Sequence, residues 1–144
     1  MRLLNKNTDY AVRALLHCAL DSEKRFLSSS EISKAQGIPL RFLRVLLQKL
    51  IKGGLLESRE GKGGGVRLAR RPEKITVLEL MRLLQGELRV SECLFRRRMC
   101  PARSGCVLRH RLLSIESKLA GEFAAITIGG LAGELSGAKR RGGK

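Results

Sequence analysis

The sequence is poor in aromatic residues, acidic residues and long apolar runs. Four Phe, one Tyr and no Trp among 144 residues leave little aromatic surface on which single-stranded bases could stack. No apolar run approaches the roughly 20 residues that a transmembrane helix needs, and no long apolar segment follows the N-terminus. Four Cys are too few for a disulfide scaffold of this length. We therefore expect a cytoplasmic protein without a membrane partner.

Positive charge is what the sequence has in excess. The chain has 29 Lys and Arg against 13 Asp and Glu, a formal net charge of +16. This excess favours a polyanionic partner, with nucleic acid first and an anionic membrane surface second, over a basic surface that is merely solvated. With 43% apolar residues, the chain has the composition of one globular domain.

No constellation typical of an enzyme is present. The sequence has no nucleotide-binding fingerprint and no cluster of residues suited to general acid–base chemistry. We therefore predict that the protein is not an enzyme. An alternative from a different functional class is a small electron-transfer protein or redox enzyme whose basic surface has no role in binding nucleic acid.

Helical periodicity begins close to the N-terminus. Asn7 and Thr8 are suitable capping residues for a helix over residues 8–21, and Asp9 lies where the helix dipole favours negative charge. Apolar residues then recur at helical spacing. Cys18 lies beside this apolar stripe, and we interpret it as a small buried side chain.

The next segment has the organisation of a helix-turn-helix. Ser28 and Glu31 form a capping box for a short helix that stops at Gly37. Pro39 suits the first turn of another helix, which ends at Gly53. Two short helices joined by a tight glycine-containing turn are typical of this DNA-binding motif.

The second of these helices has two chemically distinct faces. Its apolar face comprises Leu43, Leu46, Leu47 and Leu50, and its opposite face comprises Arg41, Arg44, Gln48 and Lys52, with Val45 among them. Arg can bind the guanine edge with both arms, Gln can bind adenine in the same way, and Lys binds phosphate. The pattern favours a helix that enters the major groove over an ordinary solvated surface helix.

A basic hairpin follows, which we expect to act as a wing. Residues 55–59 and 66–69 are predicted strands, and the six residues between them include four Gly. A slim basic hairpin can lie along phosphates or enter a minor groove. The residues expected to contact DNA here are Arg59, Lys62, Gly63, Gly64 and Arg67.

Two further helices are predicted in the second half of the chain. Thr76 and Glu79 form a second capping box, for a helix that runs to about Gln85. A helix of about 20 residues then begins at residue 107 or 108 and has a narrow apolar seam, which favours pairing with a second subunit. The seam comprises Leu112, Ile115, Leu119, Phe123 and Ile126.

These patterns predict a mainly α fold with a small β-hairpin. We expect four segments. Residues 1–86 form a winged helix-turn-helix DNA-binding domain, residues 87–106 a cysteine-containing loop and residues 107–135 a dimerisation helix with the segment after it. Residues 136–144 form a basic tail, which we expect to be disordered.

Three cysteines lie close together in the loop. Cys93, Cys100 and Cys106 are separated by six and five residues, so no Cys-x-x-Cys pair suggests a zinc ribbon. Three thiolates and a fourth ligand can hold an iron–sulfur cluster, and the surrounding arginines favour the thiolate form. Zinc, a thiol switch and plain surface cysteines remain alternatives.

The whole pattern resembles a known family. Over about residues 1–135, the chain is similar to the IscR/NsrR type of winged-helix transcription regulators, the Rrf-two family. The segments that carry this resemblance are residues 1–3, 8–15, 37–38, 63–70, 75–77 and 92–93, together with the three cysteines.

The resemblance implies a homodimer that binds an imperfect palindrome in double-stranded DNA. It implies that Cys93, Cys100 and Cys106 hold a [2Fe–2S] or [4Fe–4S] cluster. Asp9 matches the acidic residue that supplies the fourth ligand across the dimer in nitric-oxide-responsive members. His110 is the alternative, but it lies four residues after Cys106, where the cluster-biogenesis regulator has its His three residues after the third Cys.

The function implied is a repressor whose DNA affinity depends on the cluster and that senses nitric oxide, redox state or iron. The alternative is a family member without a cluster that acts as a thiol- or zinc-dependent switch. Three departures from the family pattern stand out. The first cysteine gap has six residues rather than five, Glu60 separates Arg59 from the glycines, and Pro39 and Arg41 stand where relatives often have Ser.

Overall fold

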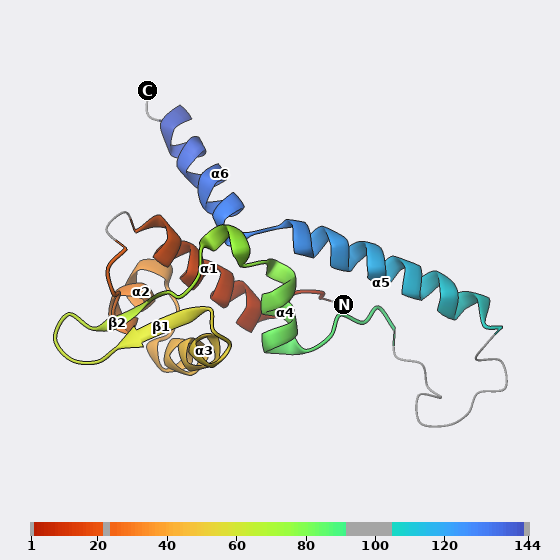
Figure 1. Cartoon of the computed structure of the whole chain (residues 1–144), viewed down its shortest axis with the longest axis horizontal. Helices are drawn as coiled ribbons and strands as arrows, with labels where there is room; N and C mark the ends of the chain where they lie inside the picture. The colour runs from red at the N-terminus through yellow and green to blue at the C-terminus, as the bar shows by residue number, and fades with distance from the viewer. Residues whose placement is uncertain (1, 22–23, 92–104, 143–144) are drawn as a thin grey trace.

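The computed structural model describes residues 2–21, 24–91 and 105–142. Figure 1 shows a body built from the first two thirds of the chain, a long helical arm and a C-terminal helix that projects from the body. Within the described residues the architecture is mainly α with one small antiparallel hairpin, as predicted. The elements are α1 (Lys6–Leu20), α2 (Ser29–Gln36), α3 (Leu40–Lys52), β1 (Leu56–Arg59), β2 (Gly65–Leu68), the 3-10 helix η1 (Pro72–Lys74), α4 (Val77–Gln85), α5 (Val107–Ala125) and α6 (Ile128–Arg141).

Helix α1 begins two to three residues earlier than predicted. Its N-cap is Asn5, whose side-chain oxygen accepts the Thr8 amide at 2.9 Å. Thr8 is not a capping residue, because its side chain is fully buried and bonds to α4. Cys18 is buried in the core, as predicted.

The helix-turn-helix has the predicted local chemistry. The Ser28 hydroxyl accepts the Glu31 amide at 3.1 Å, and α2 ends at Gly37, whose φ of 62° lies in the left-handed region. The Ser33 hydroxyl closes the turn by donating to the Ile38 carbonyl at 2.6 Å. The four leucines of α3 are all buried in the core.

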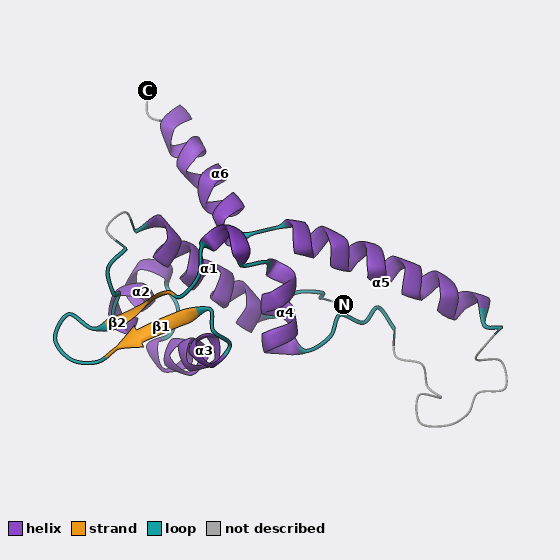
Figure 2. Ribbon diagram, viewed as in Figure 1, coloured by secondary structure: helices purple, strands orange, loops and turns teal. Residues whose placement is uncertain are grey.

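The hairpin is attached to the body by a further bridge. Leu27 and Val66 exchange backbone hydrogen bonds of 2.8 Å in both directions. A Cβ atom on Gly65 would lie 2.1 Å from the Leu27 carbonyl oxygen, so this contact requires glycine. The hairpin therefore stays close to the segment that leads into α2 (Figure 2).

The arm leaves the body and the chain then returns to it. Helix α5 is the long helix predicted from residue 107, and it ends where the Val77 amide donates to the Ile126 carbonyl at 2.9 Å. Ile128 is fully buried in the core, so the start of α6 is tied to the body.

The prediction of a disordered tail from residue 136 is wrong for residues 136–141, which belong to α6. Thr127 caps this helix by accepting the Gly130 amide at 2.9 Å. Lys139 and Arg140 lie near its C-terminal end, where the helix dipole favours cations. The glycines and basic residues of this segment are typical of a disordered tail, and this composition led to the wrong prediction.

Candidate DNA-binding surface and cluster site

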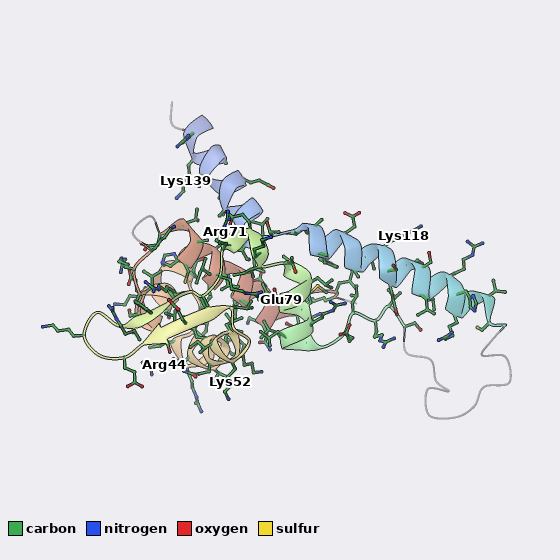
Figure 3. The ribbon with its side chains drawn as sticks, viewed as in Figure 1. Arg44, Lys52, Arg71, Glu79, Lys118 and Lys139 are labelled. Carbon is green, nitrogen blue, oxygen red and sulfur yellow. The ribbon has the colours of Figure 1, made fainter. Side chains whose placement is uncertain are left out.

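The polar face of α3 points away from the body. Figure 3 shows Arg44 and Lys52 on the side of α3 that is turned away from α1. The side chains expected to read DNA on this helix are all exposed, namely Arg41, Arg44, Gln48 and Lys52. Val45 is 59% exposed between them. The leucines on the opposite face anchor the helix, so these side chains share one accessible surface.

Lys49 is a further exposed cation on α3 that the sequence analysis did not select. It lines a shallow groove between α3 and the start of α1, together with Asn7, Pro39, Arg41, Phe42, Val45 and Leu46. Its position four residues after Val45, one helical turn further along α3, is the feature of the sequence that could have identified Lys49. The basic surface of α3 therefore extends toward α1.

The wing exposes three of the side chains that are expected to contact DNA. Arg59, Lys62 and Arg67 are exposed, and an Arg59 Nη2 atom donates to the Gly63 carbonyl at 3.0 Å. Gly64 must be glycine, because a Cβ atom there would lie 2.2 Å from the Arg59 carbonyl oxygen. Gly63 has a φ of 73°, so the two glycines shape the tip. Arg67 forms an ion pair with Glu57.

Phe26 is a residue that the sequence analysis did not select. The Cζ atoms of Arg59 and Arg67 lie 4.5 and 4.4 Å from the centre of its ring. Each such contact contributes about 0.5–1 kcal/mol at exposed sites. The sequence has only five aromatic residues, and this one lies two positions before a capping box. That position is the feature of the sequence that could have identified Phe26.

Of the predicted cluster ligands, Cys93 and Cys100 lie outside the described residues. Cys106 is a partly exposed free cysteine at the N-cap of α5, and its sulfur accepts the Arg109 amide at 3.4 Å. His110 follows one turn later and is exposed. Asp9 is exposed on α1, with one carboxylate oxygen 4.0 Å from Arg13.

Within one chain the structure does not bring Asp9 to Cys106. The start of α5 lies at the end of the arm that is far from α1 (Figure 1). Among the described residues there is no group of three or more His, Cys, Asp or Glu that could hold a metal ion. This absence does not extend to Cys93 and Cys100, because both lie outside the described residues.

Cys18 is chemically different from Cys106. Burial, together with the smaller effect of the neighbouring Asp21 carboxylate, raises the pKa of the Cys18 thiol from 9.0 to about 12. The thiol is therefore neutral at physiological pH and behaves as a small apolar side chain.

These elements define a winged helix-turn-helix DNA-binding protein. It presents an exposed basic helix and a basic hairpin on a body that also carries a long helical arm. Across the described residues, no helix is both long enough and apolar enough to cross a membrane.

Comparisons with known proteins identify the family. The model of the Rrf2 family, described as an iron-dependent transcriptional regulator, matches residues 4–134. The chain is 36% identical over 110 residues to protein aau3 of Rhizobium meliloti, covering 76% of this chain and 71% of that protein. It is 33% identical over 131 residues to the transcriptional regulator IscR of Vibrio atlanticus, covering 91% of this chain and 75% of that protein.

A solved structure has the same fold. The global cysteine regulator CymR of B. subtilis superposes with a TM-score of 0.77 at 22% identity, covering 93% of this chain and 98% of that chain. The chain belongs to the Rrf2 family. It is a transcription regulator and not an enzyme, as predicted.

Proposed function

We propose that this regulator is a cytoplasmic homodimer that represses transcription from an imperfect palindrome in double-stranded DNA, under the control of an iron–sulfur cluster. The cluster ligands would be Cys93, Cys100 and Cys106 with Asp9 of the second subunit. The observation that carries the proposal is the position of Cys106, at the start of an arm on which several apolar side chains are exposed.

The arm is suited to pair with a second copy. Helix α5 has no buried residue in the isolated chain, and Val107 and Leu108 are 73% and 67% exposed. Ile115, in the predicted seam, is also exposed. Pairing two arms would remove this apolar surface from water and place two copies of α3 on one side of a symmetric dimer. The two helices would then reach major grooves about 34 Å apart, or a multiple of that spacing.

The donor set fits an iron–sulfur cluster. Cys106 is a free, partly exposed cysteine. Together with the two cysteines within the 13 residues before it, it would supply three of the four ligands that such a cluster needs. Because α1 lies far from the start of α5 within one chain, an Asp9 ligand would come from the second subunit. His110 is the alternative fourth ligand because it follows Cys106 by one turn.

When bound, the cluster supplies iron that can be oxidised, nitrosylated or lost. Cys106 caps α5 through the Arg109 amide, so a change in the bonding of this sulfur alters how the arm begins. The other end of the arm is tied to the body at Val77 and Ile128. A coupling free energy of about 1–3 kcal/mol between the two ends would change DNA affinity roughly 5–150-fold.

Metal analysis of protein purified without air tests the cluster. Iron, sulfide and zinc contents and the visible spectrum are compared for the wild type, the triple Cys93/Cys100/Cys106→Ala variant and Cys18→Ala as the control. We expect iron and sulfide in the wild type and the control and none in the triple variant. Absence of both after anaerobic reconstitution would exclude the cluster, and zinc lost only in the triple variant would favour a zinc-dependent switch.

A random duplex library tests the DNA interface separately. We expect the wild type to select an imperfect palindrome, and an Arg41/Arg44→Ala variant to lose that selection. If the selected duplexes lack two related half-sites, the proposed dimeric arrangement on DNA is wrong.

A further inference from the structure

Two arginines of the wing lie on the same face of the hairpin. In the antiparallel register Glu57 pairs with Arg67 and Arg59 pairs with Gly65. Because side chains alternate across a strand, Arg59 and Arg67 are diagonal neighbours on one face. Two guanidinium groups so placed repel each other, and the Glu57 carboxylate forms an ion pair with Arg67.

Phe26 provides a common surface for both groups. Its ring centre lies 4.5 Å from the Arg59 Cζ atom and 4.4 Å from the Arg67 Cζ atom. The next residue, Leu27, is buried and bridged to Val66 by two backbone hydrogen bonds. This bridge fixes the backbone beside Phe26, so the ring has a defined position relative to the hairpin.

The contact with the ring leaves N–H groups of each guanidinium available. Arg59 donates from one Nη2 atom to the Gly63 carbonyl, and Arg67 donates from Nε to Glu57. Among the described residues, the other N–H groups of these two side chains have no protein acceptor. A guanidinium held against the ring presents its remaining donors in a restricted set of directions, which suits the oxygens of a phosphate.

We propose that Phe26 is a positioning residue that orients Arg59 and Arg67 to bind two backbone phosphates of double-stranded DNA at the base of the wing. This inference rests on the proposed DNA-binding function. Without the ring, two long side chains of like charge would have to be ordered when DNA binds, at a cost in conformational entropy. The ring removes part of that cost in the free protein.

The salt dependence of DNA binding distinguishes positioning from a purely structural role. Dissociation constants are measured from about 50 to 300 mM NaCl, because each phosphate neutralised contributes about 0.9 to the logarithmic slope. The probe is a duplex that the wild type selects from a random library. The variants are Phe26→Leu, Phe26→Tyr, Arg59/Arg67→Ala and the triple Phe26→Leu/Arg59→Ala/Arg67→Ala, with Lys118→Ala on the arm as the control for lost charge.

We expect Phe26→Leu to weaken binding about three- to tenfold at low salt, because the two arginine side chains would then have to be ordered when DNA binds. It should also reduce the slope by about 1–2. Phe26→Tyr keeps the ring and should have the wild-type affinity and the wild-type salt slope. Lys118→Ala should also leave both the affinity and the slope unchanged. In the Arg59/Arg67→Ala background, adding Phe26→Leu should have no further effect.

Two results would overturn the inference. One is a wild-type salt slope in Phe26→Leu, and the other is an equal loss of affinity from Phe26→Leu with and without the two arginines. Thermal unfolding of each variant checks that the body remains folded. If the Leu variant does not fold, a wild-type salt slope in Arg59/Arg67→Ala, which keeps the ring, would overturn the inference instead. If the wild type selects no duplex at all, the DNA-binding proposal fails instead.

Discussion

The Thr8 hydroxyl donates a 2.8 Å hydrogen bond to the Gln85 side-chain oxygen and so joins the start of α1 to the end of α4. Thr8 is fully buried. The same Gln85 side chain donates to the Leu3 carbonyl at 2.7 Å. The residue after Thr8 is Asp9, and the segment after Gln85 leads to the cysteines. The residue that precedes this candidate ligand is therefore joined directly to the last residue of α4.

Replacing Gln85 tests this connection. Gln85→Leu leaves the buried Thr8 hydroxyl without its closest acceptor and the Leu3 carbonyl without its donor. The Thr8 hydroxyl keeps the Asn5 side-chain oxygen as a second acceptor at 3.2 Å. Because a net hydrogen bond contributes about 0.5–1.5 kcal/mol, we expect the free energy of unfolding to fall by about that amount in urea denaturation. Gln48→Leu is the matched control because Gln48 is exposed. Equal stability of both variants would mean that Gln85 does not hold the two helices together.

Gly65 and Gly133 should respond to alanine in opposite directions. Gly65 has a φ of 145°, and a Cβ atom there would meet the backbone of Leu27. We expect Gly65→Ala to destabilise the protein by more than about 2 kcal/mol. Alanine disfavours this backbone conformation, and its Cβ atom prevents the close approach to the Leu27 backbone. Gly133 lies in α6, and no described atom lies within 4 Å of the position that an alanine Cβ would take, so Gly133→Ala should stabilise by about 0.5–1 kcal/mol. Thermal unfolding of both variants provides the measurement, and a mild effect at Gly65 would show that the hairpin can separate from Leu27.

Local patterns were sufficient to predict most of the body. The capping residues Ser28 and Thr76 and the leucines of α3 act within a few residues of their own position in the chain. Contacts between distant segments were not predictable in the same way. The burial of Thr8 depends on Gln85, 77 residues away, and Phe26 meets arginines that the hairpin brings to it. The burial of Thr8 and the contacts of Phe26 therefore became visible only in the structure.

The arginines and the last lysine of α3 should affect DNA recognition differently. If Arg44 binds a guanine edge, Arg44→Ala should cost about 1–3 kcal/mol and relax the preference at one base position. Lys52→Ala should instead weaken all duplexes about equally and lower the salt slope by about 1. Repeating the library selection with each variant tests this difference. A uniform loss for Arg44→Ala would assign Arg44 to a phosphate.

Val45 should contact a thymine methyl group. It is the apolar residue on the polar face of α3 and is 59% exposed in the free protein. Apolar side chains in the major groove pair with the thymine methyl. We expect one thymine in each selected half-site at which replacement by deoxyuridine weakens wild-type binding but leaves Val45→Ala unaffected. If no thymine shows this dependence on Val45, the side chain makes no such contact.

The buried Cys18 thiol should make stability fall at alkaline pH. Its pKa is raised from 9.0 to about 12 in the folded protein, first by burial and then by Asp21. Between these values the unfolded chain loses the thiol proton and the folded protein keeps it, so unfolding becomes more favourable as pH rises above about 9. We expect the stability difference between the wild type and Cys18→Ala to be constant below pH 9 and to shift against the wild type above it. Urea denaturation across this range measures the difference, and parallel pH profiles would mean that the Cys18 thiol ionises as readily in the folded protein as in the unfolded chain.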